Sequence, residues 1–258
     1  MTERVFRVAA VAALLLTAAA CGNRQAVPPA GAAQPDRFLF ERGTEALMQE
    51  EWMNARTYFQ QIVDNYPQSP FRPDAKLGIG DTYLGENTAE SGVLAANEFR
   101  EFLTFYPTNS RADYAQYKLA MSHFRQMRAP ERDQTETREA IKEFDVFFAK
   151  FGSSPLAPEV RQNWRIARDR LSEASYRVGL HYHRSRWYPG AIDRFREVLR
   201  DDPEYTGRDA VYYYLADSLA RTDKTPEAIP YFERLLEEYQ QSEHLEDARK
   251  RLQELKNQ

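Results

Sequence analysis

The sequence is nearly free of cysteine: of its 258 residues only Cys21 is one, and it lies near the N-terminus. No disulfide can therefore form within the chain, and no pair of cysteines with metal-ligand spacing exists. The four histidines do not form a His-Glu-x-x-His motif. Two of them, His181 and His183, are two residues apart, which places them on different faces of a helix. The sequence thus predicts neither a metal site nor a bound cofactor.

Signatures of phosphate binding and of nucleic-acid binding are also lacking. Gly78-Ile79-Gly80 follows no strand pattern, and neither a third glycine nor a lysine completes a phosphate loop. The formal net charge is −4, and it becomes −5 without residues 1–20, which contain two arginines and one glutamate. An acidic chain is not typical of a nucleic-acid binder. We therefore expect no enzymatic activity and no nucleic-acid partner.

Long hydrophobic runs are scarce. The apolar run of residues 8–16 follows Arg4 and Arg7 and is followed by small residues up to Cys21. It is shorter than the roughly 20 residues that a transmembrane helix needs. A basic start, a short apolar core and small residues before a cleavage point are typical of a secretory signal.

The position of the single cysteine makes this signal more specific. Ala18-Ala19-Ala20-Cys21 is similar to the lipobox of bacterial lipoproteins, although Ala18 stands where leucine is usual. We interpret residues 1–20 as a lipoprotein signal peptide and Cys21 as the lipid-attachment residue. Residues 21–35, rich in Ala, Pro, Gln and Gly, then form a flexible tether. The alternative is an ordinary signal peptide with an incidental cysteine.

Beyond residue 35 the sequence repeats a pattern that is clearest in residues 55–67. An alanine is followed after four residues by an aromatic residue, after three more by an apolar residue, and after four more usually by an aromatic one. These steps place the side chains on one face of a helix, which Pro or Gly often ends. The fourth copy has Asp202 where an aromatic residue is expected. The five copies begin at Ala55, Ala95, Ala140, Ala191 and Ala228.

A second, preceding helix can be inferred for each copy from a small residue twelve positions before the alanine, as at Gly43, Gly179 and Ala216. A small residue on the first helix and an Ala/Phe pair on the second are typical of the tetratricopeptide repeat (TPR). The alanines lie 40, 45, 51 and 37 residues apart, against about 34 for a minimal repeat. We predict an all-α fold: a TPR solenoid of five helix-turn-helix repeats, wound as a right-handed superhelix and closed by a capping helix at residues 245–256.

The excess spacing predicts insertions in the middle of the chain. Residues 85–92 should lengthen the turn of repeat two, and residues 129–135 the turn of repeat three. Residues 157–184 contain no strong helix breaker and read as one long helix or two closely joined ones. We expect a division into repeats one to three at residues 36–155 and repeats four and five with the capping helix at residues 156–258.

Several segments resemble the BamD (YfiO) family of outer-membrane protein assembly lipoproteins over nearly the whole chain. The resemblance is carried by Asn65-Tyr66-Pro67, by Phe99-Arg100-Glu101-Phe102 before Tyr106-Pro107-Thr108, and by Glu131-Arg132-Asp133-Gln134-Thr135 before the third repeat's helix. It implies a non-enzymatic, lipid-anchored subunit of the β-barrel assembly (BAM) complex on the periplasmic face of the outer membrane. Its implied partners are a POTRA domain of the barrel subunit BamA, further BAM lipoproteins and unfolded outer-membrane proteins.

The resemblance also suggests residue roles. Arg194 matches an arginine that contacts BamA, and Arg208 belongs to the same basic region of the C-terminal half. Tyr66 matches a position implicated in substrate contact. Phe40 and Tyr117 lie one turn before small positions of the first helices, where a TPR faces its groove, so they are candidate peptide-binding residues. The residue-level alternatives are a surface ion pair for Arg194 and helix packing for the aromatic residues.

Two other functions fit the same sequence. The chain could be a TPR lipoprotein that organises peptidoglycan enzymes or other envelope enzymes. It could also be a soluble periplasmic coordinator without a lipid.

Overall fold

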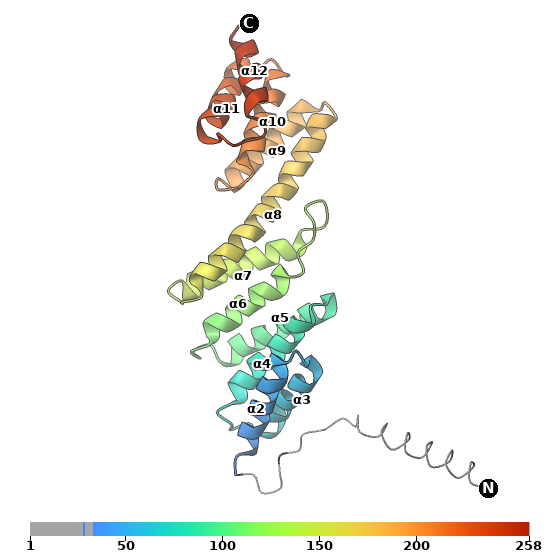
Figure 1. Cartoon of the computed structure of the whole chain (residues 1–258), viewed down its shortest axis with the longest axis vertical. Coiled ribbons are helices and arrows are strands. Elements are labelled where there is room, and N and C mark those ends of the chain that lie inside the picture. The colour runs from blue at the N-terminus through green and yellow to red at the C-terminus, as the bar shows by residue number, and fades with distance from the viewer. Residues whose placement is uncertain (1–27, 29–32, 258) are drawn as a thin grey trace, which may run out of the picture.

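The computed structural model describes residue 28 and residues 33–257, so the expected signal peptide and Cys21 lie outside the described residues. The described part folds into α-helices joined by short connections, with no strand in residues 33–257 (Figure 1). In order these are α2 (Pro35–Met48), α3 (Trp52–Asn65), α4 (Arg72–Glu86), α5 (Ala89–Phe105), α6 (Ala112–Phe124), α7 (Thr135–Phe151), α8 (Ala157–Arg184), α9 (Tyr188–Asp201), α10 (Arg208–Ala220), α11 (Thr225–Glu238) and α12 (Leu245–Lys256).

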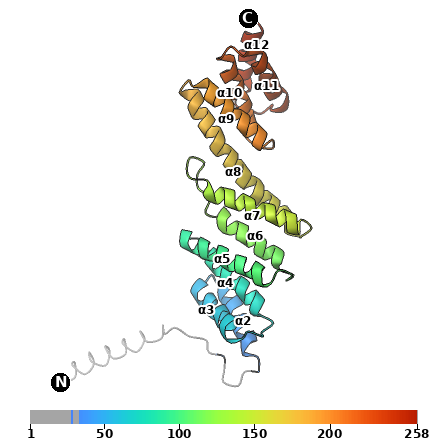
Figure 2. The same cartoon turned by 180° about the vertical axis from the view of Figure 1, so that it is seen from behind.

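The helices stack in chain order into an elongated solenoid, with α2 at one end and α12 at the other (Figures 1 and 2). Each helix packs chiefly against its neighbours in the sequence. The pairs α2/α3, α4/α5, α6/α7, α8/α9 and α10/α11 are the five expected helix-turn-helix repeats, and α12 covers the last of them. The prediction of a TPR helical solenoid is confirmed.

The repeated Ala and aromatic positions form the core, as the pattern predicts. Ala55, Phe59 and Ile62 of α3 are at most 2% exposed, and the equivalent residues of the other four copies are equally buried. A Cβ atom added at Gly43 of α2 would lie 2.6 Å from the Phe59 ring, and one at Gly78 of α4 would lie 2.5 Å from it. The ring is therefore held between two helices that approach it through glycines.

Helix α8 connects the two halves of the solenoid. Its 28 residues form one continuous helix, and it runs obliquely from the lower repeats to the C-terminal helices in both views (Figures 1 and 2). Val160 and Ala167, in its first half, belong to the hydrophobic core of repeat three. Tyr176 and Tyr182, in its second half, pack against the core of repeats four and five. One helix thus contributes to two separate cores.

The prediction that residues 85–92 lengthen the turn of repeat two is wrong. Only Asn87 and Thr88 separate α4 from α5, so the additional residues lengthen the helices and not the turn. The left-handed backbone of Asn87 (φ 52°) ends α4, and reciprocal hydrogen bonds between Thr88 and Ser91 cap α5. A turn of two residues is enough to connect the helices, because Asn87 ends α4 and Thr88 caps α5.

The insertion in repeat three is confirmed as a loop of residues 125–134 between α6 and α7. Gln134 is buried, and its side-chain amide donates hydrogen bonds to the carbonyls of Ala129 and Arg132 at 2.8 and 3.0 Å. These bonds give the loop a defined shape that it would otherwise lack, because it has no regular backbone pairing.

Candidate partner-binding groove

The aromatic residues expected to bind a peptide are mostly occupied with packing. Phe40 is half-buried and stacks on Phe71, with ring centroids 5.1 Å apart, and contacts Phe59. Tyr66 ends α3 and packs against the same core. Their side chains therefore stabilise repeat one, and only part of each ring is open to a ligand.

Tyr117 requires a correction, because the structure places it in the core and not on a groove surface. It is 5% exposed. Its hydroxyl donates a hydrogen bond to Glu159 at 2.6 Å and accepts one from Asn163 at 2.9 Å. Burial, with the hydrogen bond to Glu159, raises the pKa of this hydroxyl. Tyr117 thus joins α6 to the start of α8, and too little of its ring is exposed to hold a peptide.

A larger opening lies over the middle of α8. The helices that flank α8, α7 and α9, make no contact with each other, as is also true of α3 and α5, α5 and α7, and α9 and α11. The groove has a volume of about 680 Å³. Its floor includes Leu171, Val178 and Tyr182 of α8, and Val178 is 41% exposed. The exposed apolar floor and this volume are suited to holding a segment of another polypeptide.

The walls of the groove are basic. Arg138 of α7 and Arg132 of the 125–134 loop are exposed, and neither makes an ion pair within residues 33–257. Arg194 of α9 is 46% exposed and pairs with Glu197 at 2.7 Å. Such an exposed pair between residues one turn apart contributes little stability, so an incoming carboxylate can replace Glu197 at small cost. The groove is therefore electrostatically suited to an acidic partner.

The 125–134 loop also lines the groove. Glu131 of the loop forms an ion pair with Arg177 of α8, and Arg170 donates a hydrogen bond to the Arg128 carbonyl at 2.8 Å. Arg177 also bonds Glu173, one turn before it, at 2.6 Å. The loop therefore supplies the one carboxylate among the charged side chains that line the groove.

Arg208 does not take part in this groove. It begins α10, its guanidinium donates to the carbonyl of Pro203, and it lies 5.9 Å from the ring centroid of Tyr239. These contacts fix the turn between α9 and α10. Of the two arginines expected to bind BamA, only Arg194 lines the groove.

Sequence reasoning missed Arg132, Arg138 and Arg177 as groove residues. A signal was present: in residues 125–186 Lys and Arg outnumber Asp and Glu by 13 to 9, although the chain as a whole is acidic. What the pattern could not show is which of these charges face the same opening, because they come from α7, α8 and a loop.

Asp202 stands where the repeat pattern predicts an aromatic residue. Its contacts hold α9, one wall of the groove, against α8. Its carboxylate is 4% exposed and accepts two hydrogen bonds from the Arg165 guanidinium, one of them 3.0 Å long, and one from Ser172 at 2.6 Å. Burial by itself would raise the pKa of this carboxyl, but the bonds from Arg165 and Ser172 outweigh it, and the pKa is lowered. Asp202 thus joins the end of α9 to the middle of α8.

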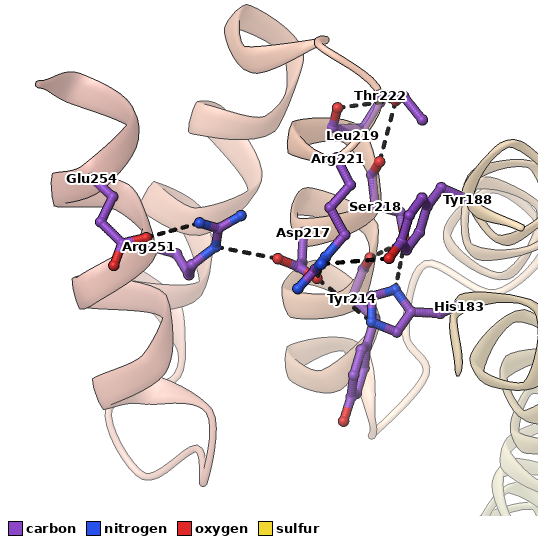
Figure 3. A network of polar contacts seen from close by, with 10 residues as sticks. All are labelled: His183, Tyr188, Tyr214, Asp217, Ser218, Leu219, Arg221, Thr222, Arg251 and Glu254. Atoms are coloured by element: carbon purple, nitrogen blue, oxygen red, sulfur yellow. Dashed lines mark hydrogen bonds and ion pairs between the residues drawn. The ribbon is translucent and has the colours of Figure 1, made fainter. Parts of the chain in front are cut away.

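A second network of polar contacts surrounds the buried carboxylate of Asp217. Figure 3 shows Asp217 of α10 between Arg221 of the same helix and Arg251 of α12, at 2.6 and 3.2 Å. His183, near the end of α8, approaches Asp217 at 3.5 Å through Nε2 and Ser218 at 3.0 Å through Nδ1. Burial lowers the pKa of His183 although Asp217 opposes this. The network connects α8, α10 and α12.

Other classes of site are not evident in the described chain. Among residues 33–257 no group of three or more His, Asp or Glu side chains is placed to hold a metal ion. None of the helices from α2 to α12 is both long and apolar enough to cross a membrane.

Comparison with known proteins places the chain in a family. The profile of the YfiO outer membrane lipoproteins matches residues 32–218, well over half of the sequence. The chain belongs to the YfiO (BamD) family. A TPR profile also matches residues 210–242, which span α10 and α11. The YfiO profile covers α2 to α9 and most of α10, and so includes the residues that line the basic groove.

Curated relatives are distant in sequence. The outer membrane protein assembly factor BamD of Caulobacter vibrioides is 26% identical over 64% of this chain and 53% of its own length. The putative BamD of Aquifex aeolicus is 26% identical over 98% of this chain and 79% of its own length. The chain thus spans only about half of the Caulobacter protein.

Solved structures of other helical-repeat proteins match this chain with low sequence identity and low TM-scores. A thermophilic TPR protein of Thermus thermophilus is 15% identical and has a TM-score of 0.37, with 86% of this chain and all of that chain covered. The TPR2AB domain of yeast Sti1 is 11% identical and has a TM-score of 0.47, with 78% and 76% covered.

Proposed function

We propose that this protein is a non-enzymatic, lipid-anchored assembly factor for outer-membrane β-barrel proteins. The observation that carries the proposal is the match to the YfiO family over residues 32–218. Relatives named outer membrane protein assembly factor BamD support the same role. Cys21 would attach the protein to the periplasmic face of the outer membrane, and residues 21–35 would act as its tether.

The basic groove over α8 is the proposed contact with a POTRA domain of a BamA-type barrel subunit. Arg194 stands on one wall and Arg138 on the opposite wall, and both are exposed. Guanidinium groups pair with carboxylates through two parallel hydrogen bonds. An acidic segment with apolar side chains would therefore pair with the arginines and cover Val178 on the floor.

The first three repeats are the proposed binding region for unfolded outer-membrane proteins. Of the expected residues, Phe40 and Tyr66 keep partly open rings, and Phe40 lines a shallow apolar depression with Met48, which is 80% exposed. Tyr117 is left out of this proposal because it is buried. The two halves would then serve different partners.

Charge reversal in the groove tests the proposed BamA contact. Arg194→Glu should weaken binding of the purified POTRA domains by about tenfold or more, equivalent to about 1.4 kcal/mol or more, because it places like charge against an acidic surface. The loss should shrink at high salt. Calorimetry of the full-length chain against the POTRA domains measures both effects.

Arg249→Glu is the matched control. Arg249 is 58% exposed and pairs with Glu246 one turn before it, much as Arg194 pairs with Glu197, but it lies on the capping helix α12. Equal loss in both variants would place the contact elsewhere. Co-purification from solubilised membranes with cell-wall synthases or hydrolases, and without BamA, would favour the envelope scaffold instead.

A further inference from the structure

Arg177 differs from the other arginines of the groove over α8 because its guanidinium is shared between two carboxylates of the described chain. Its Nε donates a hydrogen bond to Glu173 at 2.6 Å, and its Nη1 donates one to Glu131 of the 125–134 loop. Glu131 lines the groove together with Arg177, whereas Glu173 does not. The carboxylate inside the groove therefore occupies only the Nη1 side of this guanidinium.

The contact with Glu173 is the one that positions Arg177. Glu173 lies one helical turn before Arg177 on α8. It also accepts a hydrogen bond from the hydroxyl of Tyr205, a buried residue in the turn between α9 and α10. Burial, with this bond to Glu173, raises the pKa of Tyr205, so the hydroxyl keeps its proton and continues to donate. Glu173 thus orients the guanidinium whether or not Glu131 is bound to it.

The contact with Glu131 is easily broken. Glu131 is 51% exposed, and Arg177 is its one side-chain partner within residues 33–257. The loop keeps its shape through other bonds, because the backbone N–H of Arg132 and the side-chain amide of Gln134 both donate to the Ala129 carbonyl. The Glu131 side chain can therefore leave Arg177 without disturbing the loop backbone. Losing an exposed ion pair of this kind costs little free energy.

A carboxylate from an incoming polypeptide can make the same bond to Nη1 of Arg177 that Glu131 makes in the free protein. Two carboxylates at one guanidinium nitrogen would repel each other at this short range. Glu131 must therefore leave before a partner carboxylate can bind Arg177. The free protein thus contains its own competitor for an acidic ligand of the groove.

We propose that Arg177 is a partner-binding residue of the basic groove and that Glu131 is its internal competitor, which a carboxylate of the partner displaces on binding. The proposal rests on the proposed function only for the identity of the partner, a POTRA domain with an acidic surface. It gives the 125–134 loop a part in selectivity. Only a polypeptide whose own carboxylate binds Arg177 better than Glu131 does gains this contact.

Neutralising Glu131 tests the competition. Glu131→Gln should raise the affinity of the full-length protein for the purified POTRA domains by about two- to fivefold, because the free protein no longer holds an ion pair that binding must break. Calorimetry measures the affinity, and an unchanged urea midpoint shows that the variant is folded. A contact that only braces the loop against α8 predicts unchanged or lower affinity, and either result would overturn the proposal.

Asp133→Asn is the matched control for the loss of one negative charge. Asp133 is exposed and lies in the same loop, but it accepts a hydrogen bond from the Thr135 hydroxyl at 2.9 Å and does not line the groove. It should change the affinity by less than about twofold, because a solvent-exposed charge at a distance is screened by salt. An equal gain in both variants would show that only the net charge of the loop matters, and direct competition would be refuted.

A double-mutant cycle shows whether the competition takes place at Arg177. Arg177→Gln should lower the affinity for the POTRA domains by about threefold or more, because a partner carboxylate loses its donor. In that background Glu131→Gln should raise the affinity no more than Asp133→Asn does, since no guanidinium remains to compete for. An equal gain from Glu131→Gln with and without Arg177 would reject Glu131 as its competitor.

A second ligand separates this proposal from the proposed function. A fluorescent ten-residue peptide of aspartate and leucine has the acidic and apolar character that suits the groove, without the fold of a POTRA domain. Binding of the peptide alone, and more tightly in Glu131→Gln, would reject the POTRA contact and support the competition. Binding of the POTRA domains without a gain for either ligand in Glu131→Gln would reject the competition alone. If neither ligand bound the unaltered protein, both proposals would be rejected.

Discussion

Neutralising Asp202 should loosen the joint between the two halves of the solenoid. In Asp202→Asn the shape of the side chain is kept and its charge is lost. Arg165 then remains half-buried, with its side chain 22% exposed. It has Asp169 at 3.1 Å as a remaining partner. The bond from Ser172 to the carboxylate is also weakened.

The expected loss can be derived from these contacts. Removing one partner of a buried ion pair costs about 3–5 kcal/mol, because the other charge remains buried. Asp169 and partial exposure compensate some of this at Arg165, so we expect about 2–4 kcal/mol at neutral pH. The lowered pKa of Asp202 means that this stability is present above the unfolded carboxyl value and is lost as the pH falls through the folded pKa.

Urea unfolding and hydrogen exchange measure this effect. Tryptophans at positions 52, 164 and 187 report on repeat one, the first half of α8 and the start of α9. Since repeat arrays can unfold in parts, exchange should increase first in the middle of α8 and in residues 201–206. Repeat one should keep its protection.

The neighbouring residue provides the control. Asp201 is 65% exposed, and within residues 33–257 its carboxylate pairs only with the adjacent Arg200, so Asp201→Asn should change the urea midpoint little. If Asp202→Asn changed the urea midpoint as little as Asp201→Asn, the contacts of Asp202 with Arg165 and Ser172 would not stabilise the joint. Unfolding of all repeats together in the Asp202 variant would show that the two cores are not separate.

Two further predictions concern the core and a buried histidine. Phe144→Ala should cost about 3–5 kcal/mol by leaving a cavity, whereas Phe105→Ala, 69% exposed, should cost little; equal urea midpoints would refute the assigned packing. Because burial lowers the pKa of His183, the unfolded state gains a proton more readily below about pH 6.5 and stability falls as the pH falls. The urea midpoint should therefore drop less between pH 7.5 and 5.5 in His183→Gln than in the unaltered protein, and an equal drop would contradict this linkage.

The helical repeats could be predicted because their determinants are local in sequence. Ala55 and Phe59 are one helical turn apart, and the same spacing recurs in four more copies. A periodic apolar face determines which side of each helix is buried, whatever its neighbours are. The small residue at Gly43 indicated correctly where the paired helix approaches Phe59.

The positions of helix boundaries and of turns were less secure. Residues 85–92 contain two glycines and an Asn-Thr pair and so favoured a long turn. Their packing kept all but Asn87 and Thr88 helical, since Gly85 lies against the Trp52 ring and Gly92 against Gln126. Such contacts between repeats override local preference.

Side-chain exposure was the main quantity that sequence could not provide. Tyr117 and Phe40 occupy equivalent positions in the repeat pattern, yet the first is buried with its hydroxyl bonded to Glu159 of α8 and the second is partly open. The difference comes from the helix that follows. Only the third repeat has α8 placed so that it covers the ring.

By itself the sequence determined the fold class, the five helix pairs and the family, because these follow from spacing and from motifs within single helices. Only the tertiary structure decided which charges act together. Arg138, Arg177 and Arg194 come from three different helices, α7, α8 and α9, and line one groove. Asp202, which interrupts the repeat pattern, gains its role from Arg165, 37 residues earlier in the chain. Contacts of that range depend on how the helices stack, which no local pattern specifies.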